Sequence, residues 1–235
     1  MSDFQRTAIS YVPGSHTLPA EFYRSTAIFA EEQEQIFARS WNCVGRAAQL
    51  AQAGDFFLAE VAGESLIVLR DRQSTLRALF NVCRHRGTRL CREPSGRFSE
   101  TIQCPYHAWT YATDGRLLGA PHMQDVPGFE RANYPLHAAA IAEWEGFLFV
   151  NLTQQPQWFE TAYKPLLGRL SRFGLASLTG GHRTTYEVRA NWKLVFQNYS
   201  ECLHCPVIHP ELAAVLPYQS GANDLVEGPF LGGYM

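Results

Sequence analysis

Two short stretches of the chain each combine a cysteine with a histidine. The first reads Cys83-Arg-His85 and the second reads Cys104-Pro-Tyr-His107. Thiolates and imidazoles hold both zinc ions and iron–sulfur clusters in proteins, so these side chains predict a metal centre built from two loops. Two assignments are open: a mononuclear zinc ion, or a 2Fe-2S cluster with two Cys on one iron and two His on the other. Core histidines beside buried thiols are the alternative without a metal.

The mixed order of the ligands favours the cluster over zinc. Zinc fingers usually pair Cys with Cys and His with His along the chain, whereas each loop around a binuclear cluster has to reach both irons. Gly87 and Pro105 suit tight loops of this kind. Exchanging two thiolates for neutral imidazoles makes the cluster less negative and raises its potential, so that a ferredoxin-type donor can reduce it.

A second group of potential ligands follows later in the chain. Glu201 lies three residues after Asn198 and three before His204, and His209 comes five residues further on. Residues three apart share one face of a helix. An unbroken helix would separate the two histidines by about 140° around its axis. Pro206 disfavours helical geometry at the residue before it, so we expect a bend that brings the histidines together.

Two imidazoles and a carboxylate form the ligand set by which non-haem Fe(II) keeps positions open for dioxygen. The second group therefore predicts a mononuclear iron site at His204 and His209. A local zinc site made of Cys202, His204, Cys205 and His209 is the main alternative. Ordinary core or surface histidines are a further one.

Both groups resemble the Rieske non-haem iron oxygenases, in particular their oxygenase (α) subunits. The run Cys83-Arg-His-Arg-Gly87 and the run Cys104-Pro-Tyr-His-Ala-Trp109 are similar to the Rieske domain, and the run Asn191-Trp-Lys to His209 is similar to the start of the catalytic domain. The resemblance implies one Rieske 2Fe-2S cluster and one mononuclear non-haem Fe(II). It assigns the cluster to Cys83, His85, Cys104 and His107 and the iron to His204 and His209. The third iron ligand, a carboxylate, is expected beyond residue 235.

In this family the acidic residue at the position of Glu201 hydrogen-bonds the iron histidines and links the two centres across a subunit boundary. The resemblance therefore implies catalytic roles for Glu201 and Asn198. Glutamate at this position is familiar from the homotrimeric group that includes quaternary-ammonium monooxygenases and demethylases, whereas many aromatic-ring dioxygenases carry aspartate.

The implied function is that of a terminal oxygenase component. It would use O₂ to hydroxylate a small organic substrate by ring dihydroxylation, monooxygenation or oxidative N-demethylation. Electrons would come from an NAD(P)H-linked flavin/iron–sulfur reductase or a ferredoxin, and the assembly would be a homotrimer with or without a β subunit. The alternative is a Rieske-type electron carrier without oxygenase activity, in which Glu201, His204 and His209 are bystanders.

Patterning along the chain predicts an α+β fold. Ser25 caps an expected helix at 25–40, and helical periods recur at 158–173 and 192–203. Short β-type runs follow at 55–61, 64–70, 76–82, 101–105, 146–151 and 184–190.

Three regions follow from this pattern and from the resemblance. Residues 1–40 form an N-terminal helical segment that packs on the catalytic domain, and 41–152 form a β-sandwich or barrel-like Rieske domain. Residues 153–235 open a catalytic domain of helix-grip type, which we expect to be incomplete. Asp224, the one aspartate after His209, is expected in a loop.

Composition excludes several classes of protein. Among 235 residues, 20 are Lys or Arg and 22 are Asp or Glu, which gives a net charge of −2 and argues against a nucleic-acid binder. The apolar runs are far shorter than the roughly 20 residues that span a bilayer. The N-terminus lacks an apolar signal-peptide core, which predicts a reducing cytoplasm without disulfides.

Overall fold

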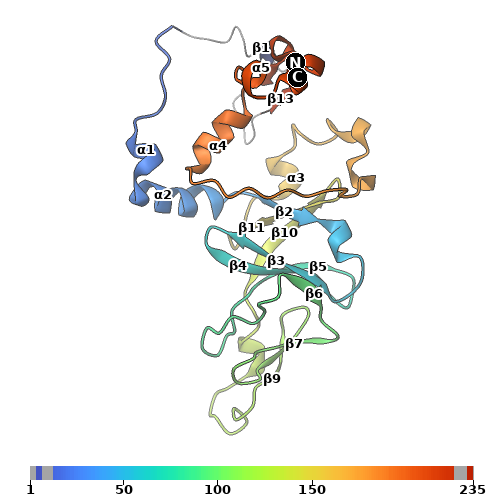
Figure 1. Ribbon diagram of the computed structural model, residues 1–235. Coiled ribbons are helices and arrows are strands. Elements are labelled where there is room, and N and C mark those ends of the chain that lie inside the picture. Colours follow the sequence, from blue (N-terminus) through green and yellow to red (C-terminus); the bar gives the residue numbers. More distant parts are fainter. Residues whose placement is uncertain (1–3, 7–12, 225–231, 235) are drawn as a thin grey trace. The chain divides into compact units, whose positions relative to one another are not determined.

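The computed structural model describes residues 4–6, 13–224 and 232–234. The chain divides into two compact units: unit 1 comprises Met1–Ala30 with His182–Met235, and unit 2 comprises Glu31–Gly181. Figure 1 shows the elements of both units. No helix within the described ranges is long and apolar enough to cross a membrane.

Unit 2 is built on an antiparallel sheet of seven strands. Their order in the sheet is β2-β11-β10-β5-β4-β3-β6. The strands are β2 (Asn42–Arg46), β3 (Asp55–Val61), β4 (Glu64–Arg70), β5 (Leu76–Phe80), β6 (Ser95–Arg97), β10 (Ala138–Trp144) and β11 (Phe147–Asn151). The strands predicted at 55–61 and 64–70 are confirmed with their bounds, and those predicted at 76–82 and 146–151 are confirmed within two residues.

Strand β4 contributes buried side chains to both faces of the seven-stranded sheet. Leu66 and Val68 belong to a core that also contains Leu148, while Ile67 and Leu69 belong to a second core. All four β4 side chains are fully buried. Successive side chains of a strand point to opposite faces, so one run of four apolar residues serves both cores.

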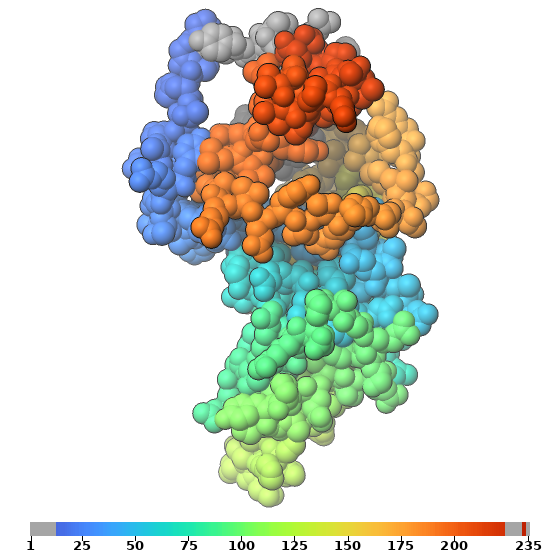
Figure 2. All heavy atoms as spheres, in the orientation of Figure 1, coloured from blue at the N-terminus to red at the C-terminus, as the bar shows by residue number. Residues whose placement is uncertain are grey.

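A smaller antiparallel sheet lies at one end of unit 2. It has the order β7-β8-β9, with β7 at Thr101–Gln103, β8 at Thr110–Ala112 and β9 at Leu117–Gly119. In Figures 1 and 2 its strands, in green, lie at the end of the unit away from β2. The second core contains Ile102 and Tyr111 of this sheet together with Ile67 of the large one, so it packs the two sheets of unit 2 against each other.

Unit 1 joins segments from both ends of the chain. Its sheet has the order β1-β12-β13, and the Tyr23 hydroxyl and Gln197 Oε1 are 3.3 Å apart. Its elements are β1 (Phe4–Arg6), α1 (Glu21–Arg24), α4 (Trp192–Tyr199), α5 (Cys205–Ile208), α6 (Pro210–Val215), a 3₁₀ turn at Tyr218–Ser220, β12 (Ala222–Asp224) and β13 (Gly232–Tyr234). Asp224 is a strand residue, contrary to the prediction of a loop.

The predicted N-terminal helix is present, with a change of type. Helix α2 covers Thr26–Glu32 and continues as a π-helix over Gln33–Phe37, and the Ser25 hydroxyl accepts a hydrogen bond from the Ile28 amide at 3.3 Å. This hydrogen bond, from the amide three residues later to the Ser25 side chain, confirms Ser25 as the N-terminal cap of the helix. The unit boundary falls within α2, between Ala30 and Glu31.

Two other predictions of regular structure are wrong. The region 158–173 contains only α3 (Phe159–Ala162) and a 3₁₀ turn at Ser171–Phe173, and another such turn follows at Leu175–Ser177. The segment 184–190 is not a strand in the structure, and Tyr186 and Val188 are 82% and 64% exposed. Its alternating sequence suits a strand, but a strand also needs a paired neighbour, and no described segment supplies one.

Candidate metal centres

The first centre is formed by two loops of similar construction. Cys83 and His85 lie between β5 and β6, where the Cys83 amide donates to the Thr88 carbonyl at 2.8 Å and the Gly87 amide donates back to the Cys83 carbonyl at 3.0 Å. Gly87 has a φ of +73°, which a residue without a Cβ adopts easily. The cysteine is thus held at the base of a tight turn.

Cys104 and His107 occupy the matching turn between β7 and β8. The Cys104 amide donates to the Trp109 carbonyl at 2.8 Å, and the Ala108 amide donates to the Cys104 carbonyl at 3.1 Å. Because this turn connects adjacent antiparallel strands, its cysteine is fixed by the sheet. The structure therefore gives the two Cys–His pairs equivalent supports.

The thiols of Cys83 and Cys104 lie in the core that packs the two sheets of unit 2 against each other. Cys83 and Cys104 are 2% and 3% exposed. The Cys83 Sγ is 3.3 Å from the Tyr111 hydroxyl, which also accepts a hydrogen bond from the Arg84 amide at 3.1 Å. Burial raises the pKa of the Cys83 thiol, and the adjacent Cys104 raises it further. A positive metal centre would offset that cost by stabilising the thiolates.

Sequence reasoning missed Tyr111. The signal was present, because Tyr111 follows His107 and Trp109 at alternate positions and falls on a strand that leads away from the Cys104 loop. Burial raises the pKa of Tyr111, so its hydroxyl stays protonated and can donate to sulfur. This side chain supports the centre without being one of its ligands.

The two imidazoles lie together nearer the surface. The ring centroids of His85 and His107 are 4.8 Å apart, and His85 stacks on Trp109 with an interplanar angle of 9°. His85 is exposed and His107 is half-buried. Partial desolvation and the neighbouring His107 lower the pKa of His85, which favours the neutral, metal-binding form.

An unpartnered atom shows that this set fits a metal cluster. The Nδ1 atom of His107 is buried and has no hydrogen-bond partner, the only such side-chain atom in the described part of the chain. A buried imidazole nitrogen without a partner is costly unless a metal takes the place of the hydrogen bond. Paired thiols and paired imidazoles match a binuclear cluster with two protein ligands on each iron.

The four side chains of the first centre do not converge as the ligands of a single zinc ion would. No group of three or more His, Cys, Asp or Glu side chains converges on one metal position among the described residues. A zinc ion would need such a group, whereas each iron of a Rieske cluster takes only two protein ligands. The observation thus favours the cluster over the zinc alternative for the first centre.

The second centre begins with a pair of side chains just after α4. The Nδ1 atom of His204 lies 2.7 Å from Oε1 of Glu201, and the Leu203 amide donates to the other carboxylate oxygen. Burial opposes ionisation of Glu201, but these two hydrogen bonds outweigh it and hold the pKa of Glu201 below its usual value. The carboxylate fixes the imidazole through Nδ1, so that Nε2, which lies 4.0 Å from Sγ of Cys205, is the nitrogen that could bind a metal.

The segment 192–203 is not one continuous helix. Helix α4 ends at Tyr199, so Glu201 and His204 meet across a turn and not along a helix face. The predicted bend at Pro206 is also wrong, because Pro206 lies in the first turn of α5, where a proline costs no helical hydrogen bond. The chain instead breaks between α4 and α5, and again at His209 between α5 and α6.

The predicted histidine pair is nevertheless close. The ring centroids of His204 and His209 are 5.5 Å apart. Asn198 is exposed on α4, and no hydrogen bond links it to Glu201 or His204 in the described structure. The structure thus brings His204, His209 and Glu201 together and leaves Asn198 outside the group.

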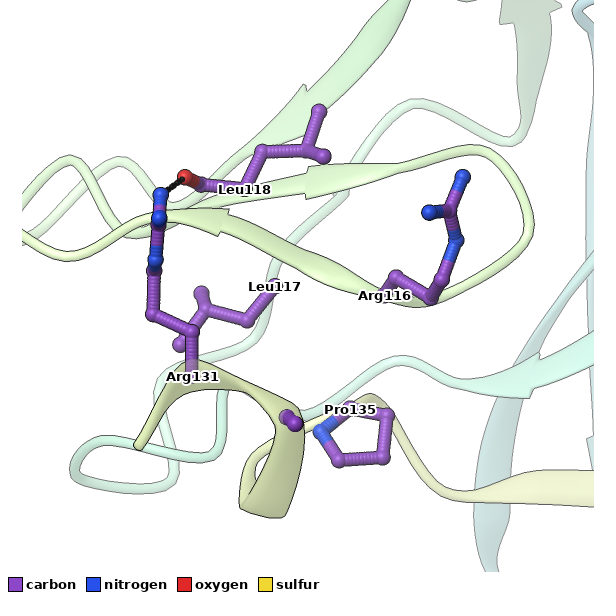
Figure 3. A pocket seen from close by; sticks show the side chains of 6 residues that line it. Arg116, Leu117, Leu118, Arg131 and Pro135 are labelled. Carbon is purple, nitrogen blue, oxygen red and sulfur yellow. Dashed lines mark hydrogen bonds between the residues drawn. The ribbon is translucent and has the colours of Figure 1, made fainter. Parts of the chain in front are cut away.

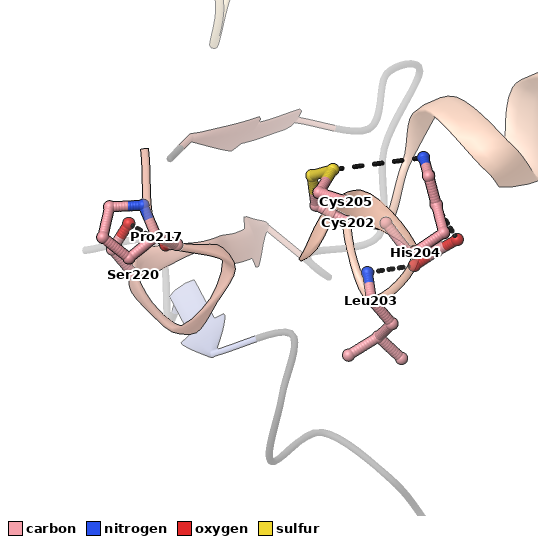
Figure 4. The surroundings of a disulfide bond; sticks show 7 residues. Cys202, Leu203, His204, Cys205, Pro217 and Ser220 are labelled. Atoms are coloured by element: carbon pink, nitrogen blue, oxygen red, sulfur yellow. Dashed lines mark hydrogen bonds and ion pairs between the residues drawn. A yellow bond between two sulfur atoms is a disulfide. The ribbon is translucent and has the colours of Figure 1, made fainter. Parts of the chain in front are cut away.

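Cys202 and Cys205 form a disulfide around His204 (Figure 4). Their Cα atoms are 5.0 Å apart, within the usual range for such a bond. This finding corrects the prediction that disulfides are absent. That prediction rested on the expected reducing compartment, whereas the turn after α4 brings these two cysteines, three positions apart, within bonding distance. Disulfide sulfurs are also unavailable as thiolate ligands, so the local zinc site is not formed in this state.

A surface pocket of unit 2 takes no part in either centre (Figure 3). It is lined by Arg116, Leu117, Leu118, Arg131, Ala132 and Pro135. Arg116 is paired with Asp114 at 2.7 Å, and Arg131 donates to the Leu118 carbonyl. Its two cations are therefore already engaged, and it offers no metal ligand.

Comparison with known families agrees with the two centres. Residues 40–130 match the Rieske 2Fe-2S domain, and residues 175–229 match the catalytic domain of the ring-hydroxylating alpha subunit. The first match contains both Cys–His loops, and the second contains Glu201, His204 and His209. A Rieske domain followed by this catalytic domain defines a class of iron-dependent oxygenase subunits.

The chain thus carries a Rieske domain and part of this catalytic domain, and it is similar to the oxygenase subunits of Rieske non-haem iron oxygenases. It is 38% identical to the carnitine monooxygenase oxygenase subunit of Acinetobacter baumannii over 84% of this chain and 53% of the relative. It is also 38% identical to the glycine betaine monooxygenase oxygenase subunit of Chromohalobacter salexigens, over 85% of this chain and 44% of the relative. The chain thus spans about half the length of the curated relatives that it matches.

Solved structures support the same assignment. A quaternary ammonium Rieske monooxygenase, described for carnitine oxidation and inter-subunit electron transfer, superposes with a TM-score of 0.78 at 34% identity, covering 87% of this chain and 59% of the other. The predicted α+β class with a Rieske-type antiparallel sheet is confirmed. The cofactors implied by the family are a Rieske cluster and a mononuclear non-haem iron.

Proposed function

We propose that this chain forms the Rieske domain and the first part of the catalytic domain of a terminal oxygenase that acts on a small quaternary ammonium compound. The named activities of the relatives, on carnitine and on glycine betaine, support this substrate class. Monooxygenation with loss of an N-substituent is the proposed reaction. The observation that carries the proposal is the Glu201–His204 contact of 2.7 Å beside His209, because an electron carrier needs no such group.

Each centre has residues to hold it. Cys83, Cys104, His85 and His107 would hold the Rieske cluster, and His204 and His209 would hold the iron. We propose a third, carboxylate ligand beyond residue 235. When bound, the cluster supplies single electrons and the mononuclear iron supplies dioxygen activation.

The side chains around these ligands have separate tasks. The Tyr111 hydroxyl lies 3.3 Å from the Cys83 sulfur and would donate to it when that sulfur is a thiolate ligand, and Trp109 covers one face of His85. Both limit the access of water to the first centre. Glu201 holds His204 in the tautomer with a proton on Nδ1, which keeps Nε2 as the metal-binding atom. Asn198 makes no hydrogen bond to Glu201 or His204 in the described structure. We therefore propose only an indirect role, in which Asn198 helps to position the end of α4.

The partners follow from the chemistry. The electrons have to come from outside the subunit, so we propose an NAD(P)H-linked flavin/iron–sulfur reductase or a ferredoxin as donor. We also propose a homotrimer in which Glu201 of one subunit contacts the cluster-binding loops of the next subunit. The proposed location is the cytoplasm.

Metal analysis of the full-length protein tests the proposal. The expected result is about three irons per chain, two of them in a cluster with a Rieske-type spectrum after reduction. His204→Ala should remove one iron and leave the cluster spectrum unchanged. Two irons per chain in the unmodified protein would favour the electron carrier and refute the oxygenase.

An oxygen-uptake screen tests the substrate class. With a reductase present, betaines and carnitine should stimulate oxygen uptake and release an amine or aldehyde product in equal amount. Stimulation by aromatic acids alone would contradict the quaternary ammonium assignment while leaving the oxygenase intact.

A further inference from the structure

The Cys202–Cys205 disulfide is the one chemical feature of the second centre that the proposed function does not use. The two cysteines flank His204, and Figure 4 shows the S–S bond beside the imidazole. Cys205 is 2% exposed and Cys202 is half-buried. The pair thus lies against a proposed metal ligand.

The free nitrogen of His204 is close to one of these sulfurs. The Nε2 atom of His204 lies 4.0 Å from Sγ of Cys205, while Nδ1 is engaged by Glu201. In a tetrahedral zinc site, with Zn–S near 2.3 Å and Zn–N near 2.0 Å, a sulfur and a nitrogen ligand lie about 3.5 Å apart. The present separation of these two atoms is therefore within about half an ångström of that value, and the two sulfurs would move apart once their bond is broken.

We propose that reduction of the Cys202–Cys205 disulfide opens a thiolate–imidazole site for a soft divalent cation such as Zn²⁺, formed by both cysteines and His204. In the disulfide the sulfurs are poor ligands, so His204 remains available for iron. In the dithiol they become strong ligands, and the cation that they hold occupies Nε2 of His204. The redox state of the pair thereby selects the metal at this histidine, a consequence that rests on the proposed function.

The chemistry balances with a dithiol reductant. The reductant gives two electrons and two protons to the disulfide, whose S–S bond breaks as two S–H bonds form, and the reductant closes its own disulfide. Zn²⁺ then displaces the two thiol protons when it binds. The fourth position of the tetrahedron is left to water.

Zinc uptake by the full-length, cluster-loaded protein tests the proposal. One sample is kept oxidised; the other is reduced with dithiothreitol, which is then removed without air. Both are mixed with a slight excess of Zn²⁺ and desalted, and zinc is measured by elemental mass spectrometry. Reduction should expose two additional thiols and add about one zinc per chain.

Two variants make the test specific. Cys205→Ser and Cys202→Ser should each abolish the gain in zinc on reduction, because neither variant has a disulfide whose opening supplies two thiolates. Cys43→Ser removes an exposed free cysteine of unit 2 and should leave the gain unchanged. The visible spectrum of the cluster reports whether each variant is folded. Because Cys202 is only half-buried, its variant remains informative even if Cys205→Ser fails to fold.

The outcomes separate this proposal from the proposed function. Equal zinc in the two redox states, or a gain that survives in either cysteine variant, would overturn the inference. If reduction adds no zinc while mononuclear iron is still bound through His204, the inference fails and the proposed oxygenase function stands. A zinc gain in a protein that never binds mononuclear iron would instead refute the oxygenase and keep the zinc site.

Discussion

Within the first centre, the four potential ligands differ in exposure. Both cysteines are buried in the core, whereas His85 is exposed and His107 is half-buried. A cluster in this position would keep its sulfur ligands away from water and present its imidazole edge to a partner. Hydrogen bonds to sulfur and solvent access are two of the means by which proteins set the potential of such clusters.

Tyr111→Phe tests the hydrogen bond to sulfur. Loss of the hydroxyl removes a donor 3.3 Å from Cys83 Sγ and should lower the cluster potential. A hydrogen bond worth about 1 kcal/mol corresponds to about 40 mV for one electron. Potentiometric titration followed by electron paramagnetic resonance measures the shift. An unchanged potential would mean that the hydroxyl does not donate to the cluster.

Glu201→Gln tests whether the Glu201 carboxylate supports the proposed iron ligand His204. The amide keeps the shape of the side chain but removes its charge, so iron and cluster should stay bound while substrate-coupled turnover falls about 10–100-fold. Turnover with full metal content is the measurement, and Glu211→Gln, an exposed glutamate in α6, is the matched control. Unchanged turnover would remove Glu201 from the mechanism.

Among the elements, the edge of the large sheet carries an ion pair with a defined pH dependence. Asp55 of β3 lies opposite Arg97 of β6, and Arg97 Nε donates to Asp55 Oδ1 at 2.6 Å. This hydrogen bond holds the pKa of Asp55 below its usual value of 3.8. Since the pKa is lower in the folded state, the pair stabilises the fold above about pH 4. That contribution disappears as the pH falls through the folded-state pKa.

Asp55→Asn should therefore lower the free energy of unfolding at pH 7 by about 0.5–1 kcal/mol, the scale of a partly exposed pair. The difference from the unmodified protein should shrink below pH 4. Urea unfolding at pH 7 and pH 3 measures both values, with the exposed Asp125→Asn as control. A difference that persists unchanged at pH 3 would contradict the assignment.

The turns at the ends of β3 differ in their tolerance of a side chain. Gly54 and Gly63 have φ values of +90° and +80°, but a Cβ on Gly54 would collide with the Phe98 carbonyl, whereas one on Gly63 would meet nothing within 4 Å. Gly63→Ala should cost about 1–2 kcal/mol of stability, the penalty of left-handed backbone for alanine. Gly54→Ala should cost clearly more, as measured by thermal unfolding. Equal losses would contradict the steric argument.

For the whole molecule, the two centres lie in different units, the cluster ligands in unit 2 and the iron histidines in unit 1. A homotrimer that passes electrons between subunits predicts complementation between defective chains. In trimers mixed equally from His107→Ala and His204→Ala chains, about a quarter of the interfaces would join an intact cluster to an intact iron site. We expect about that share of normal turnover.

The separate His107→Ala and His204→Ala trimers should be inactive, and each is a control for the mixture. Turnover of the reassembled or co-expressed mixture is the measurement. An inactive mixture with normal trimer content would place electron transfer within one subunit.

The local sequence alone determined which side chains can bind metal. The Cys83, His85, Cys104 and His107 pattern is specific because two loops with one thiol and one imidazole each suit few centres other than a Rieske cluster. Strands β3 and β4 were also predictable, since short runs rich in apolar and β-branched residues, bounded by turn residues, favour a strand without knowledge of its partners.

Only the tertiary structure decided how those side chains are supported. Tyr111 reaches Cys83 because the sheet β7-β8-β9 packs on the core of the large sheet, and no local pattern contains that contact. Likewise, helical periodicity at 192–203 did not reveal the turn that joins Glu201 to His204 and Cys202 to Cys205. Periodicity reports local preference, whereas the ends of elements and the contacts between distant residues depend on which neighbours are available to pack and to form hydrogen bonds.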